Sequence, residues 1–197
     1  MLKYAALVAV FLSLTISAAA GPMTTGERQR LVAHFEMTEA WLVSELDGLT
    51  DTQLRFRMTP DSWTIMDVVE HLAIAEPQYW KNLQDPLKQP VKEGFKPQAT
   101  DAGILWYGID RTERTTTGDA RVPRGTFPSM QESLASFRKL RATMLDTART
   151  SQEDLRGRAL EGGYQDLYQW FLMISTHSQR HILQIREVKA HANYPRR

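Results

Sequence analysis

The sequence from Gln165 to His191 reads QDLYQWFLMISTHSQRHILQIREVKAH. Six positions in it follow one another at spacings of four, three, four, three and four: Trp170, Ile174, His177, His181, Gln184 and Val188. This period places them on one face of an α-helix, and most of them are apolar or imidazole side chains. The sequence therefore predicts a long final helix whose core-facing side carries His177 and His181.

Three earlier segments show the same helical period. The first spans residues 24–48 and opens with a capping box, Thr24-x-x-Glu27. The second starts at Ser62 or Thr64 and continues to about residue 83, with Pro77 expected to kink or break it, since proline lacks the backbone donor. The third follows Ser129, three residues before a glutamate, and ends near residue 148.

Residues 86–128 differ in character from these helices. Five of the nine prolines and five of the eleven glycines fall there, and helical spacing is limited to a single turn around residues 104–107. The apolar side chains in the segment argue against disorder, so we expect a wrapped loop packed on the core. With no alternating strand period, the chain is predicted to be all-α: a four-helix bundle with one long crossover between the second and third helices, which lets two neighbours run parallel.

Composition excludes several classes of function. The chain has 197 residues, 24 Lys and Arg against 23 Asp and Glu, and a formal net charge of +1, so no basic excess favours nucleic acid. The absence of cysteine excludes disulfides, iron–sulfur clusters, thiolate zinc sites and a cysteine nucleophile. A phosphate loop, a serine-hydrolase elbow and a His-Glu-x-x-His helix are also missing. Any metal must be held by histidine or oxygen ligands.

The first twenty residues have the layout of a secretory signal peptide. Lys3 precedes an uncharged, mostly apolar run that ends in Ala18-Ala19-Ala20. Its unbroken apolar part, residues 4–12, is shorter than the ~20 residues that span a membrane. We expect cleavage after Ala20, a mature domain over residues 21–197, no stable membrane anchor afterwards, and a periplasmic or secreted protein. The alternative is an uncleaved anchor or a buried first helix.

Three histidines are candidate metal ligands. His177 and His181 lie one turn apart on one helix face, and His71 lies at the margin of the apolar face of the second helix. The alternative is that they are histidines at the edge of the core, bonded to neighbouring side chains. Because buried imidazoles need polar partners, a shared divalent metal would satisfy all three and leave a coordination position open. Zinc, nickel, iron and copper all suit imidazole.

Four further residues are weaker candidates, each with a structural alternative. Asp67 precedes His71 by one turn and could accept its second N–H, or could be a solvated carboxylate at the helix start. Glu76 and Gln184 could serve as acid–base or orienting groups, or as polar residues at the core edge. Arg180 could hold an anionic substrate group, or form a surface salt bridge.

These residues resemble the DinB-like (damage-inducible, YfiT-related) superfamily of metal-binding four-helix bundles. The resemblance is carried by Trp63-Thr64, by Glu70-His71-Leu72 and by Met173-x-x-x-His177-x-x-Arg180-His181-x-x-Gln184-Ile185. It implies a divalent metal on His71, His177 and His181. Some members of the superfamily are transferases or isomerases that use low-molecular-weight thiols, such as bacillithiol transferases. An exported protein would lack those cytosolic donors, which makes water the more available nucleophile.

The function expected from these observations is metal-dependent hydrolysis or group transfer on a small molecule. The alternative is a non-catalytic bundle that binds metal, or a partner at residues 86–128. Trp41 and Leu42 are candidate exposed apolar residues that would allow a homodimer without requiring one.

Overall fold

The computed structural model describes residues 21–113 and 116–196, so the predicted signal peptide lies outside the described residues. Four long helices dominate: α1 (Thr25–Leu46), α3 (Ile65–Leu87), α5 (Met130–Thr150) and α6 (Leu167–Ala190). Three short elements join them: α2 (Asp51–Leu54), α4 (Asp101–Tyr107) and the 3₁₀ turn η1 (Asp119–Arg121). The described part of the chain has no β-strand, only an isolated bridge between Ala159 and Asp166.

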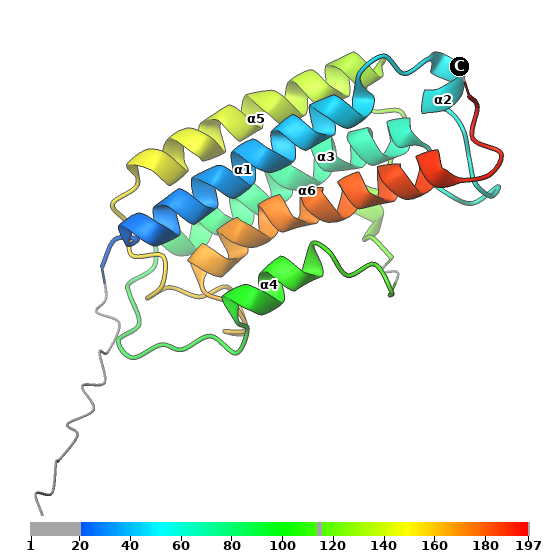
Figure 1. Cartoon of the computed structure of the whole chain (residues 1–197). Helices are drawn as coiled ribbons and strands as arrows, with labels where there is room; N and C mark the ends of the chain where they lie inside the picture. Colours follow the sequence, from blue (N-terminus) through cyan, green and yellow to red (C-terminus); the bar gives the residue numbers. More distant parts are fainter. Residues whose placement is uncertain (1–20, 114–115, 197) are drawn as a thin grey trace, which may run out of the picture.

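Each long helix packs against two others. Helices α1 and α3 each contact both α5 and α6, so the bundle order is α1, α6, α3, α5. Figure 1 shows that α3 and α5 run in the same direction, opposite to α1 and α6. The long connection between α3 and α5 makes this parallel pair possible. The predicted all-α four-helix bundle with one long crossover is confirmed.

Local capping explains where the helices begin. The Thr24 hydroxyl accepts from the Glu27 N–H while the Glu27 carboxylate accepts from the Thr24 N–H, as predicted. Thr64 and Asp67 form the same reciprocal pair, so α3 is capped by Thr64 rather than Ser62.

Pro77 does not break α3. The helix continues through it to Leu87, so the expected break does not occur. The residues on both sides of Pro77 are buried against α5 and α6, among them Ala75 and Trp80. This burial compensates for the backbone hydrogen bond that proline removes.

The crossover wraps the bundle, as expected. Helix α4, which has seven residues where a single turn was predicted, packs on α6 and buries Ile104 in the core. Farther along, the Glu70 carboxylate accepts backbone N–H groups from Arg124, Gly125 and Thr126, at 2.8–3.1 Å. The crossover therefore packs against α6 and is hydrogen-bonded to α3.

The expectation of an exposed apolar pair at Trp41 and Leu42 is wrong. Leu42 is fully buried and Trp41 is half-buried beneath Arg186, so they do not form the exposed apolar pair that was expected. Over the described residues, no helix has the length and apolar character needed to cross a membrane.

Candidate metal centre

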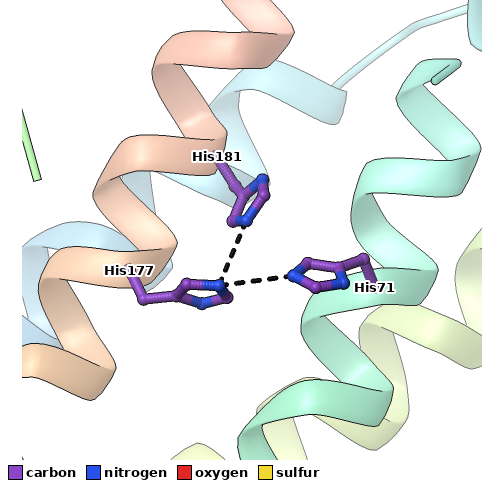
Figure 2. Close-up of side chains that lie close together, drawn as sticks. All are labelled: His71, His177 and His181. Carbon is purple, nitrogen blue, oxygen red and sulfur yellow. Dashed lines mark hydrogen bonds between the residues drawn. The ribbon is translucent and has the colours of Figure 1, made fainter. Parts of the chain in front are cut away.

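The three predicted histidines converge between α3 and α6. Figure 2 shows His71 on α3 facing His177 and His181 on α6. The Nε2 atom of His177 lies 3.3 Å from Nε2 of His71 and 3.1 Å from Nε2 of His181. Two nitrogens bound to one tetrahedral ion at ~2.05 Å lie about 3.3 Å apart, so the spacing fits a shared metal.

The outer ring nitrogens decide where the protons lie. His71 Nδ1 donates to the backbone carbonyl of Arg121 at 2.8 Å, and His181 Nδ1 donates to the amide oxygen of Gln184 at 2.8 Å. In the neutral rings, Nε2 of both residues therefore presents a lone pair to the centre of the cluster. The Nε2 atom of His177 carries at most one hydrogen, so it can donate to only one of these two nitrogens. A cation at that point would satisfy all three nitrogens.

Burial keeps the cluster neutral. His71 and His177 are almost entirely buried, and burial lowers the pKa of both below the ordinary value. Burial, with a further contribution from His71, lowers the pKa of His181 to about 3. Neutral imidazole is the form that binds a metal.

Aromatic rings hold the histidines in place. The Trp63 ring lies 4.9 Å from the His71 ring and is stacked on His181 at 6.2 Å, measured between centroids. Tyr79 meets His177 edge-on at 5.1 Å. These contacts leave the rings little freedom to rotate away from the centre.

A cavity of about 430 Å³ adjoins the cluster and is lined by all three histidines. Its lining also includes the exposed residues Asp61 and Thr116, so it opens to solvent. The volume is that of a small-molecule site. A small solute can therefore reach the three Nε2 atoms from outside.

Comparison with known proteins assigns the chain to a family. Residues 30–185 match the family model of the DinB superfamily. The chain belongs to the DinB superfamily. That match spans most of the bundle, from α1 to α6, and includes all three histidines.

Two proteins of Bacillus subtilis are similar to this DinB-superfamily chain. It is 26% identical to the uncharacterized protein YuaE (strain 168) over 155 residues, which cover 77% of this chain and 91% of YuaE. A solved structure of YfiT, described as a probable metal-dependent hydrolase with an unusual four-helix bundle topology, aligns with a TM-score of 0.59. That alignment covers 88% of this chain and 91% of YfiT at 19% sequence identity, so it supports the shared fold.

Of the two residues predicted to orient the histidines, one contacts a histidine and the other does not. Gln184 lines the cavity, and its amide oxygen accepts a hydrogen bond from His181 Nδ1. Asp67 does not contact His71 in this way: its carboxylate caps α3 and pairs with Arg57 at 3.1 Å. The Arg121 carbonyl takes the role expected for Asp67.

Glu76 lies away from the centre. It is five residues after His71, about 140° around the helix, and points toward α5. There its fully buried carboxylate forms an ion pair with Arg141 and accepts from Ser178 Oγ at 2.5 Å. Burial raises the pKa of Glu76, although Arg141 opposes the rise. Its position in the structure is that of a packing residue joining three helices.

Arg180 lines the cavity and does not form the surface salt bridge given as its alternative role. Its guanidinium donates to the backbone carbonyls of Tyr107 and Glu113. Arg180 forms no ion pair with the residues that the structure describes, 21–113 and 116–196.

Sequence reasoning missed Arg111 and Glu187, which also line the cavity and pair through two contacts of 2.7 and 2.8 Å. Arg111 lies in the aperiodic crossover, where spacing carries no signal.

Proposed function

We propose that this DinB-superfamily protein is an exported metal-dependent hydrolase that binds one divalent metal on His71, His177 and His181. The observation that carries the proposal is the convergence of three Nε2 atoms, two of them with their Nδ1 protons already committed to fixed acceptors. The description of YfiT as a probable metal-dependent hydrolase supports the same assignment.

The residues of the chain would bind and orient, while the metal would supply the electrophile. A divalent ion on these three histidines would act as a Lewis acid and would lower the pKa of a water molecule. Gln184 and the Arg121 carbonyl hold the ligand tautomers, and Trp63 fixes two of the rings. The cavity admits a small substrate beside the ligands, an arrangement that favours an enzyme over a purely structural metal site.

Metal analysis tests the site. The protein, purified without chelators or a polyhistidine tag, should contain close to one equivalent of a divalent metal by elemental mass spectrometry. The His71→Ala, His177→Ala, His181→Ala triple variant should contain none, whereas the matched control His191→Ala, outside the cluster, should keep it. A folded wild-type protein that takes up no zinc, nickel, iron or copper would contradict the proposal.

Hydrolysis requires a second assay. A panel of small esters and amides should include substrates cleaved by the metal-loaded protein and not by the chelated protein or the triple variant. Cleavage that survives in the triple variant would assign the activity elsewhere.

Export rests on residues 1–20 of the sequence. Expressed in its host, the protein should be recovered outside the cytoplasm with Gly21 as its first residue, by N-terminal sequencing. Recovery of the uncut chain in the cytoplasm would refute this part of the proposal.

A further inference from the structure

The charged side chains that line the cavity differ in whether they form an ion pair. Four charged side chains line it: Asp61, Arg111, Arg180 and Glu187. Arg111 and Glu187 neutralise each other through a two-contact ion pair. Asp61 is exposed to solvent, whereas Arg180 is 8% exposed. The buried charge that remains is therefore the guanidinium of Arg180.

Backbone carbonyls hold Arg180, and Asp110 adds an electrostatic interaction but forms no ion pair with it. The two terminal nitrogens donate to the carbonyl oxygens of Tyr107, at 3.2 Å, and Glu113, at 2.5 Å. The Tyr107 ring lies 5.1 Å from the guanidinium carbon. These contacts orient the side chain but use only part of its five N–H donors. A buried cation of this kind is stabilised by an anionic partner.

The three histidines also favour an anionic solute in the cavity. All three are neutral, so a divalent metal bound to them would retain its full charge, unlike a metal with carboxylate ligands. Arg180 lies on α6 between His177 and His181 in sequence and lines the same cavity. The cavity would therefore present two positive centres to a solute.

We propose that Arg180 is the specificity residue that binds an anionic oxygen group, carboxylate or phosphate, of a small substrate. This inference rests on the proposed hydrolase function and names its substrate class. A guanidinium matches two oxygens of such a group through parallel hydrogen bonds. The apolar part of the substrate would lie against the Trp63 and Tyr107 rings, which also line the cavity.

Calorimetric titration with matched probes tests the proposal. Benzoate and its neutral isostere benzamide, together with phenyl phosphate, are titrated into the metal-free and the zinc-loaded protein. In both states benzoate or phenyl phosphate should bind about tenfold or more tightly than benzamide. Whichever of the two binds more tightly identifies the carboxylate or the phosphate as the group recognised.

Two variants separate Arg180 from general electrostatics. In the metal-free protein, Arg180→Gln should lose the preference for the anion, whereas Arg186→Gln, which removes an arginine of the same helix that pairs with Glu45 outside the cavity, should keep it. Zinc content is measured in every sample. A preference in metal-free wild-type protein supports Arg180 even if the metal proposal fails.

Three results would overturn the inference. They are equal binding of benzoate and benzamide to wild-type protein, no binding of either anion, and a preference that persists in metal-free Arg180→Gln. The comparison of probes on wild-type protein decides the first two even if Arg180→Gln fails to fold.

Discussion

His177 differs from the other two histidines of the cluster. Its Nδ1 atom is buried and has no hydrogen-bond partner among the described residues, whereas Nδ1 of His71 and His181 each has a fixed acceptor. The orientation of His177 thus depends on packing against Tyr79, while the other two rings are also held by hydrogen bonds. Acceptors of this kind raise the basicity of a ligand and fix its tautomer.

Replacement of Gln184 tests the role of such an acceptor. Gln184→Leu keeps the bulk of the side chain but removes the oxygen that binds His181 Nδ1. We expect zinc affinity to fall about 10- to 100-fold, measured by competition with a chromophoric chelator, with the thermal unfolding of the zinc-free protein little changed. Gln131→Leu, at an exposed position of α5, is the control. Equal zinc affinity in the two variants would remove Gln184 from the site.

The crossover between α3 and α5 completes the candidate metal centre. Its Arg121 carbonyl orients His71, and the adjacent Glu70 carboxylate accepts three of its backbone N–H groups. Burial raises the pKa of Glu70, but these donors lower it more, and the net shift is downward. The carboxylate form therefore stabilises the fastened crossover, and this contribution is lost as the pH falls below the ordinary value of 4.5 through the lowered pKa.

Glu70→Gln should loosen the crossover at neutral pH. The amide keeps one acceptor oxygen, so we expect a loss of about 1.5–3 kcal/mol of local stability and faster proteolysis between residues 88 and 129. Glu93→Gln, an exposed glutamate of the same segment, serves as the control. Cleavage of the two variants at the same rate would show that Glu70 does not fasten this segment.

The sequence predicts elements better than contacts between them. Helical spacing and capping boxes located the long helices and placed His71, His177 and His181 on inward faces. The spacing of Asp67 from His71 was also favourable, but the carboxylate is used to cap α3. The acceptor for His71 is a backbone carbonyl of the crossover, which any residue type supplies, so no side-chain pattern could reveal it.

Three neutral histidines between α3 and α6, two of them buried and His181 half-buried, make the metal-free bundle sensitive to acid. Burial lowers the pKa of each in the folded protein, to about 3 for His181. Below pH ~6.5 the unfolded chain binds protons that the folded chain does not, so the free energy of unfolding falls as the pH falls.

Urea unfolding of the metal-free protein between pH 7.5 and pH 5 checks this sign. Each histidine should lower the free energy of unfolding by up to ~1.4 kcal/mol per pH unit below its unfolded pKa. The His71→Gln, His177→Gln, His181→Gln variant should lose this part of the pH dependence while keeping that of the carboxylates. Parallel curves for variant and wild-type protein would contradict neutral burial of the cluster.

Anomalous diffraction from zinc-loaded crystals tests most directly whether the three histidines share one metal ion. We expect a single strong anomalous peak between α3 and α6, about 2.0–2.1 Å from Nε2 of His71, His177 and His181. A zinc-loaded crystal with no peak between these three nitrogens, or with its peak at other residues, would contradict it.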